Sequence, residues 1–437
     1  MAVPEDHARP DGPTVAIHVA VIPSLARRKE GDPVVLLAGG PGQAASDLGR
    51  MAEALSAIRR TRDIVLVDQR GTGLSRTLTC PALSAPLPDD AWNDPRYNDE
   101  ALMRAEWQRC IAELQGNPRT HRTDDYVADL ERVRGALGAR QFNLWGGSYG
   151  SRVALRYMQL HPQAIRSSVL DGVAPTSLKL PQDILAHTEA LLRDRFAACG
   201  RQQACADTHG NLSARFDELL ATLSRTPAKV RLPHPATGRP IDATIDDRGL
   251  LALLWPLLYT PETFRLVPQM IQQAAAGDFA ALVTSTAGRS SRDFEFSPLL
   301  RVAVLCAEDM AGHPSAQAGR WQRLEQLFLD ACRDFPAGQA PADFFAPTRS
   351  DVPTLLVSGS LDPVTPPSEA ERAARTLMRH RHVIVEGWGH IVSHHPCVRR
   401  AVVRFIETAD PQADPLACEA ELKLPDPLFY VTNLVAK

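Results

Sequence analysis

Several features are missing from this sequence of 437 residues. No apolar run approaches the roughly 20 residues that a membrane-spanning helix needs, and no internal repeat or low-complexity segment is present. The net charge is only −3, which gives no reason to expect nucleic acid or an anionic membrane as a partner. No cysteine couple has CxxC spacing and no histidine cluster accompanies one, so we expect no zinc site.

The N-terminus, MAVPEDHARPDG, also lacks a charged segment followed by an apolar one. Two interpretations are therefore open: a cytosolic protein, or one whose signal peptide has been replaced by a start Met. The composition is that of an ordinary globular protein, with 44% hydrophobic and 23% charged residues. Because the chain is long for a single core, we expect either one large domain with an insertion or two domains.

Eight cysteines bear on the compartment. They fall along the chain as four neighbouring couples, which predicts the sequential pairings Cys80–Cys110, Cys199–Cys205, Cys306–Cys332 and Cys397–Cys418. Disulfides persist in oxidising compartments, so this pairing predicts a secreted or periplasmic protein. The alternative is eight buried free thiols in a cytosolic enzyme, because cysteine is also a common core residue.

What is present is organised around the stretch FNLWGGSYG, residues 142–150. An apolar strand leads into a glycine-rich turn that carries Ser148, and a segment with helical periodicity follows. This is the G-x-S-x-G pattern of a nucleophile elbow. Glycine neighbours let the strand and the helix approach each other closely, and the turn holds the serine hydroxyl above the sheet. The alternative is a glycine-rich strand-to-helix turn with an incidental serine.

Apolar strands alternate with helices over the first 174 residues, which predicts an α/β fold with a mainly parallel sheet. Residues 14–22 are expected to form the opening strand. From about residue 175 to residue 346 the alternation stops, and mostly helical stretches with one short hairpin near residue 230 take its place. Strands return at residues 352–360 and 382–390. We therefore expect a discontinuous core, residues 1–174 and 347–437, with a helical cap, residues 175–346, inserted between its halves.

A serine hydroxyl needs a base, and the base needs an acid that orients it. In the α/β-hydrolase fold these groups follow the serine in the order acid, then histidine. Asp362 and His390 come directly after the two returning strands, at the same sheet edge as Ser148. We expect these three residues to form a catalytic triad. Asp171 is a second possible acid, ranked below Asp362 as a residue that orders the turn into the helical block.

A tetrahedral oxyanion needs two N–H donors. The residue after the nucleophile supplies one, so the backbone amide of Tyr149 is the first candidate. The second is expected from the glycine-rich loop that follows the first core strand, at Gly40 or, less favoured, Gly39. His394 and His395 also lie near the final strand, but we place them at the start of the last helix.

Taken together, the motifs GGPGQ, DQRGTGLS, GGSYGS, LDPVTP and GWGH resemble the prolyl iminopeptidase and tripeptidyl aminopeptidase family of serine peptidases. The resemblance extends from Val3 to about Cys418. Prolyl iminopeptidases usually have His where this chain has Ala38, and Trp where it has Tyr149. Both departures resemble the larger, secreted, cysteine-containing branch, as do the last two cysteine couples. The resemblance thus implies secretion independently of the composition.

Enzymes of this family release residues from a free N-terminus, so the resemblance implies a site for an ammonium group. Such a cation calls for carboxylates. Glu308 and Asp309, beside Cys306, are the first candidates, and Asp293 and Glu295 are weaker ones. The alternative for Glu308 and Asp309 is a solvated acidic pair at a helix end.

We therefore expect an aminopeptidase that releases proline or short peptides through an acyl-enzyme, with no metal or organic cofactor. The substrate would be a peptide, or else a small molecule if the chain is instead an esterase, lactonase or amidase, because one fold hosts many chemistries. A catalytically silent binding protein is the third interpretation.

Overall fold

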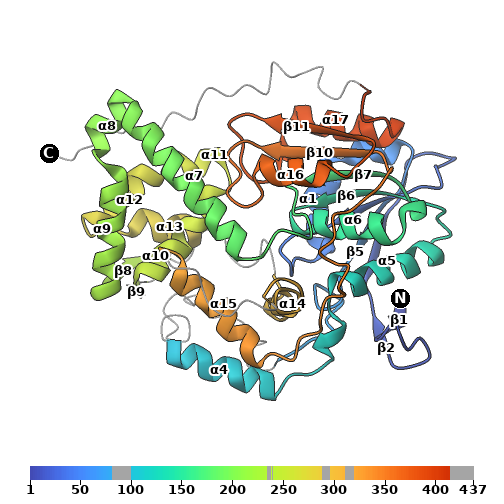
Figure 1. Ribbon diagram of the computed structural model, residues 1–437, viewed down its shortest axis with the longest axis horizontal. Coiled ribbons are helices and arrows are strands. Elements are labelled where there is room, and N and C mark those ends of the chain that lie inside the picture. The colour runs from blue at the N-terminus through green and yellow to red at the C-terminus, as the bar shows by residue number, and fades with distance from the viewer. Residues whose placement is uncertain (81–99, 234–237, 239, 288–295, 311–318, 414–437) are drawn as a thin grey trace.

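A computed structural model describes residues 1–80, 100–233, 238, 240–287, 296–310 and 319–413 (Figure 1). Its centre is a seven-stranded sheet in the order β11-β10-β7-β6-β4-β5-β3. The strands are β3 (Val19–Ile22), β4 (Val34–Leu37), β5 (Ile64–Val67), β6 (Phe142–Gly147), β7 (Ile165–Asp171), β10 (Thr354–Gly359) and β11 (His380–Val385). All neighbours are parallel except β3 and β5. The predicted mainly parallel sheet is confirmed.

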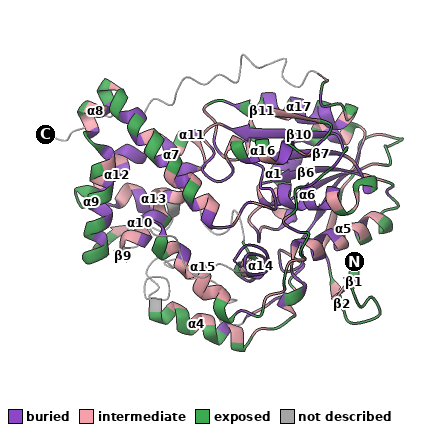
Figure 2. Cartoon of the chain, in the orientation of Figure 1, coloured by how far each residue is buried: buried purple, intermediate pink, exposed green. Residues whose placement is uncertain are grey.

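Helices cover both faces of this sheet, which explains why its central strands are continuous apolar runs. One cluster packs α5 (Thr123–Ala136), α6 (Tyr149–Leu160) and α16 (Pro367–Ala374) onto the sheet. A second cluster packs α1 (Gly49–Ala54) and α17 (Pro396–Thr408) onto it. Figure 2 shows the strands buried and the helices exposed on their outer sides. Ligand-binding loops are therefore confined to the ends of the strands.

The predicted opening strand over residues 14–22 is wrong in one respect, because it is two strands. β2 (Thr14–Ala16) pairs with β1 (Ala2–Pro4) in a small separate sheet, whereas β3 joins the main sheet antiparallel to β5. The alternation of apolar residues is nearly the same in both pieces, so the pattern alone did not reveal the break at residues 17–18. The arm expected to be irregular thus contains a short strand.

The segment between β7 and β10 is mostly helical, as the sequence predicts. It contains α7 (Gln182–Arg201), α8 (Gln203–His209), α9 (Leu212–Arg225), α10 (Asp247–Leu254), α11 (Pro261–Phe264), α12 (Val267–Ala275), α13 (Ala280–Ala287), α14 (Pro298–Val304) and α15 (Gln322–Asp334). The expected hairpin is β8 (Ala228–Pro233) with β9 (Pro240–Ile245). Buried residues between positions 185 and 321 form a hydrophobic cluster of their own. This separate cluster supports the predicted cap, whose boundaries stay a prediction.

Part of the predicted cap packs instead against the sheet side of the molecule. Leu300 and Val304 of α14 belong to the same cluster as α5 and α6. The π-helical turn Leu305–Asp309 continues α14 and is fully buried. In Figure 1, α14 lies between the sheet and the inserted helices. The apolar pattern of α14 predicted its helical structure but not which of two cores it would join.

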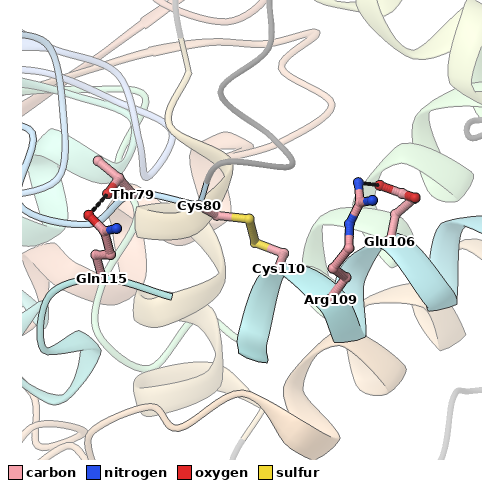
Figure 3. Close-up of a disulfide and its surroundings, with 6 residues drawn as sticks. All are labelled: Thr79, Cys80, Glu106, Arg109, Cys110 and Gln115. Atoms are coloured by element: carbon pink, nitrogen blue, oxygen red, sulfur yellow. Dashed lines mark hydrogen bonds and ion pairs between the residues drawn. A yellow bond between two sulfur atoms is a disulfide. The ribbon is translucent and has the colours of Figure 1, made fainter. Parts of the chain in front are cut away.

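Three of the four predicted disulfides are confirmed: Cys80–Cys110, Cys199–Cys205 and Cys306–Cys332. Figure 3 shows the first of them, which ties the chain after β5 to α4 (Glu100–Ala112). Cys397 lies at the start of α17, whereas Cys418 lies outside the described residues, so the fourth pairing stays a prediction. Among the described helices, none is both long enough and apolar enough to cross a membrane.

Candidate active site

Ser148 lies at the tip of the turn between β6 and α6. Its backbone has φ 55° and ψ −123°, a conformation that costs a non-glycine residue about 1–3 kcal/mol. The turn is held by close packing, because a Cβ on Gly150 would come within 2.1 Å of the Leu37 carbonyl oxygen on β4. Ser148 itself is half-buried. The sequence therefore builds the strained, accessible serine that the elbow pattern predicts.

Asp362 and His390 meet across the loops after β10 and β11. The His390 Nδ1 atom lies 2.7 Å from Asp362 Oδ2, and the Thr365 hydroxyl donates to the same oxygen at 2.9 Å. The other oxygen, Oδ1, accepts the backbone N–H groups of Val364 and Thr365 at 2.8 and 2.9 Å. This set of donors fixes the carboxylate and, through it, the orientation of the imidazole ring, which leaves Nε2 as its second nitrogen for another partner.

The electrostatics of this pair favour opposite charges. Burial alone would raise the pKa of Asp362, but the charge of His390 and the hydrogen bonds to the carboxylate hold that pKa below its usual value. Burial alone would lower the pKa of His390, but the Asp362 carboxylate outweighs it and raises that pKa. An imidazole in this position is a stronger base than a free histidine, and its charged form is stabilised.

The turn at Asp171 and Gly172 brings Ser148 and His390 to the same place. The Ser148 N–H donates to the Asp171 carbonyl oxygen at 2.8 Å. Gly172 has φ 62°, and a Cβ there would lie 2.9 Å from His390 Cε1, so the imidazole rests on this glycine. The serine turn and the histidine ring therefore contact two adjacent residues at the carboxyl edge of the sheet.

Asp171 itself has a different role from either one considered in the sequence. Its carboxylate oxygens accept the backbone N–H groups of Val392 and Ser393 at 2.9 and 2.8 Å. It contacts neither an imidazole nitrogen nor the turn into the inserted helices through its side chain. Instead it anchors the loop that carries His390, whose next residue, Ile391, has φ 66°. Aspartate after a strand was too common a pattern to reveal this.

The glycine-rich loop after β4 lies beside the candidate nucleophile. A Cβ on Gly39 would come within 3.2 Å of the Ser148 Cβ. The Gly39 N–H donates to Gln43 Oε1 at 3.3 Å, which favours Gly40 over Gly39 as an oxyanion donor. The Tyr149 amide is the first of α6, where N–H groups have no partner within the helix. The loop and the helix start thus lie on either side of Ser148.

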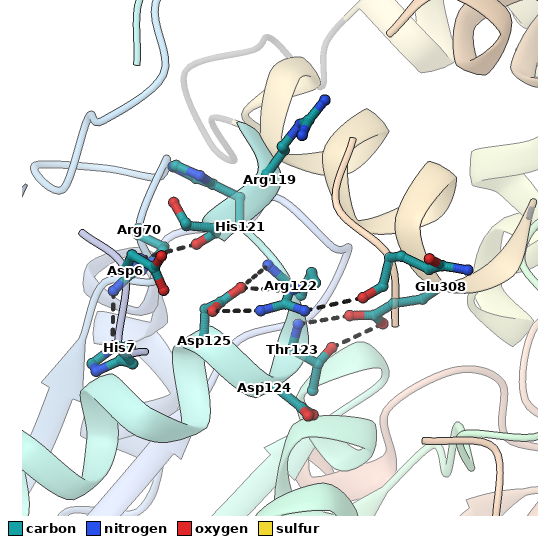
Figure 4. A network of polar contacts seen from close by, with 12 residues as sticks. Asp6, His7, Arg70, Arg119, His121, Arg122, Thr123, Asp124, Asp125 and Glu308 are labelled. Carbon is teal, nitrogen blue, oxygen red and sulfur yellow. Dashed lines mark hydrogen bonds and ion pairs between the residues drawn. The ribbon is translucent and has the colours of Figure 1, made fainter. Parts of the chain in front are cut away.

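Glu308 and Asp309 lie in the π-helical turn after α14 and are buried. The Glu308 carboxylate accepts the Thr123 N–H at 2.6 Å and the Thr123 hydroxyl at 2.9 Å (Figure 4). It therefore caps α5 by accepting an N–H group of the first turn, which has no partner within the helix. The Thr123 hydroxyl also lies 2.8 Å from the Tyr149 phenol oxygen. A chain of contacts thus runs from Glu308 to the residue after Ser148.

Arg152 of α6 completes this buried group. Its Nη1 donates to both Asp309 oxygens at 3.1 and 3.0 Å and lies 3.7 Å from Glu308 Oε2. Burial raises the pKa of Glu308 to about 8, against the opposing attraction of Arg152. With no exposed carboxylate surface, the geometry gives the pair a structural role and does not support the predicted amine site. Asp293 and Glu295 lie outside the described residues.

The motif DQRGTGLS is also structural. Asp68 accepts the Ser46 and Leu74 N–H groups, which closes the loops after β4 and β5 against each other. Arg70 is fully buried, binds Asp129 with two nitrogens at 2.8 and 2.6 Å, and donates to carbonyl oxygens of the N-terminal arm, including that of Glu5. These contacts fix the N-terminal arm and α5 relative to the sheet that carries the candidate site.

Tyr259 is a neighbour of His390 that the sequence did not suggest. Its carbonyl oxygen accepts the His390 N–H at 2.8 Å, and its ring packs edge-on against the imidazole with centroids 5.3 Å apart. Tyr259 belongs to the inserted segment, just before α11. No motif marked it, because a tyrosine within a run of apolar residues is typical of any helix interface. The inserted segment therefore contacts the candidate base directly.

The comparison with known families agrees with this geometry. Residues 32–394 match the model of the alpha/beta hydrolase fold. The chain belongs to the alpha/beta hydrolase family. The match includes both returning strands of the sheet and the whole inserted segment. The insertion of this hydrolase therefore lies inside the range of residues that matches the family.

Three curated relatives span most of this hydrolase. It is 27% identical to the putative hydrolase YuaR of Escherichia coli over 434 residues, which cover 90% of this chain and 81% of that one. It is 27% identical to the serine protease Hip1 of Mycobacterium tuberculosis, covering 84% and 76% of the two chains. It is 24% identical to the tripeptidyl aminopeptidase of Streptomyces coelicolor, covering 96% and 82%.

Proposed function

We propose that this hydrolase is a serine aminopeptidase in which Ser148 is the nucleophile, His390 the general base and Asp362 the acid that orients it. The observation that carries the proposal is the 2.7 Å contact between His390 and Asp362, beside the strained turn of Ser148. A buried carboxylate and a histidine of raised pKa next to an accessible serine are the parts that acyl transfer needs.

The mechanism has two steps. In the first, His390 Nε2 accepts the Ser148 proton while the serine oxygen attacks the scissile carbonyl, and the Gly40 and Tyr149 amides stabilise the oxyanion. The imidazolium then gives its proton to the leaving amine, and an acyl-enzyme remains. In the second step His390 activates a water, which releases the acyl group and regenerates the serine. Asp362 stabilises the imidazolium in both steps without taking its proton.

Two facts favour a peptide over another acyl substrate. Relatives named serine protease and tripeptidyl aminopeptidase match more than 80% of this chain. The inserted segment also contacts His390 through Tyr259, which places it where it can limit how much of a substrate enters. The second candidate is an esterase or amidase for a small molecule, because the same three residues would cleave an ester.

A matched set of chromogenic substrates distinguishes these functions. The set comprises prolyl, alanyl and Ala-Ala-Pro anilides, their N-acetylated forms and a short-chain nitrophenyl ester, with Ser148→Ala as the control. We expect cleavage of the free-amine anilides, loss of that cleavage on acetylation, and a fall of at least about 10⁴-fold in Ser148→Ala. Cleavage of the ester alone would overturn the aminopeptidase, and activity that survives Ser148→Ala would overturn the mechanism.

We also propose that the protein acts outside the cytosol. Three disulfides among the described residues support this location, because cytosolic thiols are kept reduced. Thiol titration of the denatured, non-reduced protein purified from its natural host is the test. Eight free thiols would rule the proposal out.

A further inference from the structure

Arg301 differs from the buried arginines of this hydrolase in having no anionic partner. Arg70, Arg152 and Arg156 are buried, and each binds at least one aspartate. Arg301 lies on α14 and is exposed. Within the described part of the chain no hydrogen-bonding or ion-pairing group contacts its guanidinium, which lies over the Phe328 ring, 5.5 Å from the ring centroid.

Two parts of the inserted segment nevertheless lie near Arg301. Burial lowers the pKa of this guanidinium, although solvent reaches the side chain. The Phe328 ring belongs to α15, and Tyr259, which is close enough to interact electrostatically, belongs to another part of the inserted segment. Arg301 is therefore an exposed cation with aromatic residues of the inserted segment near it.

Arg301 also lies near two parts of the candidate active site. A Cβ on Gly42 would lie 3.6 Å from the Arg301 Cβ, and the Ser297 N–H at the start of α14 donates to the Gly42 carbonyl oxygen at 2.8 Å. The loop of Gly39 to Gly42 lies beside Ser148. On the other side, Tyr259 packs against His390. Arg301 is therefore between the oxyanion loop and the residue that touches the base.

We propose that Arg301 binds a carboxylate of the peptide substrate and so determines specificity. This rests on the proposed function, which it deepens. A partly desolvated guanidinium with no hydrogen-bond acceptor among the described residues is ready to form the two parallel hydrogen bonds that a carboxylate offers. The Phe328 ring does not take the place of a carboxylate acceptor, so the guanidinium N–H groups can bind that ligand. The carboxylate can be the C-terminal group of a short peptide or an acidic side chain.

The test measures binding to the Ser148→Ala protein by calorimetry, so that no turnover interferes. One pair of tetrapeptides differs only in a free or amidated C-terminus, and a second, amidated pair differs only in one Glu or Gln. We expect at least about tenfold tighter binding of the carboxylate member in one of the pairs, and that pair identifies the source. Adding Arg301→Met should bring the two members within about twofold of each other, and Arg301→Lys should retain part of the preference.

Arg132→Met is the matched control, because Arg132 is an exposed arginine of α5 and the net charge changes equally. It should leave the preference unchanged. Equal binding within both pairs, no binding of any peptide, or a preference that persists in Arg301→Met would overturn the proposal. Free-amine anilides carry no carboxylate, so their cleavage tests the aminopeptidase function separately. If they are not cleaved, the proposed function fails, and the calorimetric comparison still decides the proposal for Arg301.

Discussion

Asp362 and Glu308 both carry buried carboxyl groups, but their surroundings shift the pKa values of these groups in opposite directions. Asp362 accepts two backbone N–H groups and the Thr365 hydroxyl and contacts His390, and its pKa lies below the usual value. Glu308 accepts the N–H and hydroxyl of Thr123, and burial raises its pKa to about 8. Burial opposes ionisation at both sites, so the partners decide the outcome.

The difference shows what separates a group that can act on a substrate from one that holds the fold. His390, the partner of Asp362, belongs to a loop beside the half-buried Ser148. The partners of Glu308 and Asp309 are a helix start and Arg152, both of which are buried. A carboxylate in the first setting transmits its charge to the proposed base, whereas one in the second setting joins α14 to α5 and α6.

The largest expected effect comes from a substitution that disrupts the contact between Asp362 and His390. Asp362→Asn keeps the size of the side chain but removes its charge and allows the wrong imidazole tautomer, so we expect kcat to fall by about 10⁴-fold. His390 must be neutral to act as base, so activity is lost as the pH falls through its pKa. Without the carboxylate that raises this pKa, the acidic limb of kcat/KM for the residual activity should move to lower pH.

Steady-state kinetics from pH 5 to 9 measure both effects. The comparison variant is Asp171→Asn, which changes an equally buried aspartate that bonds Val392 and Ser393 of the His390 loop and acts on His390 only through its charge. Because the charge of Asp171 raises the pKa of His390 less than Asp362 does, the acidic limb should move to lower pH by less than in Asp362→Asn. A fall of less than tenfold in Asp362→Asn would remove Asp362 from the proposed triad.

The next largest effect comes from a substitution that disrupts the buried pair of Arg152 and Asp309. Arg152→Met removes the cation that neutralises Asp309 and leaves a buried carboxylate unpaired, so we expect a loss of about 3–5 kcal/mol in the free energy of unfolding. Urea denaturation measures it. Arg333→Met is the control, since Arg333 is 59% exposed and its pair with Asp330 should contribute less than about 1 kcal/mol. Equal losses in the two variants would contradict the buried-pair interpretation.

The smallest effect, measured per pH unit, is the change in the free energy of unfolding that the ionisation of Glu308 causes. Glu308 keeps its proton up to pH about 8 when folded but loses it near 4.5 when unfolded, so the folded state binds more protons in between. The contribution of Glu308 to the free energy of unfolding should therefore decrease as pH rises through that window, by at most about 1.4 kcal/mol per pH unit. Glu308→Gln removes this contribution.

Urea denaturation of both proteins between pH 5 and 8 gives the two slopes, and identical slopes would contradict the raised pKa. The same variant tests the original amine-binding prediction for Glu308. We expect cleavage of free-amine anilides to persist in Glu308→Gln, because the carboxyl is buried against Thr123. A selective loss of that cleavage, with the ester still hydrolysed, would support the prediction that Glu308 binds the substrate amine.

The sequence by itself determined the α/β core, the elbow of Ser148, the positions of Asp362 and His390 after successive strands, and three disulfide pairings. These features depend on short-range rules: apolar runs form buried strands, and parallel strands end at one edge, so residues that follow them meet there. The disulfides joined near neighbours in the chain, which the order of the cysteines already favoured.

Only the tertiary structure decided the rest. The roles of Asp171, Glu308 and Asp309 depend on partners 157 to 222 positions away or on the absence of solvent, neither of which a local pattern records. The same holds for Tyr259, which reaches His390 from the inserted segment, and for Arg301, which has no anionic partner among the residues that the structure describes. A side chain's charge state and availability are set by what surrounds it in space, and the chain decides that only when it folds.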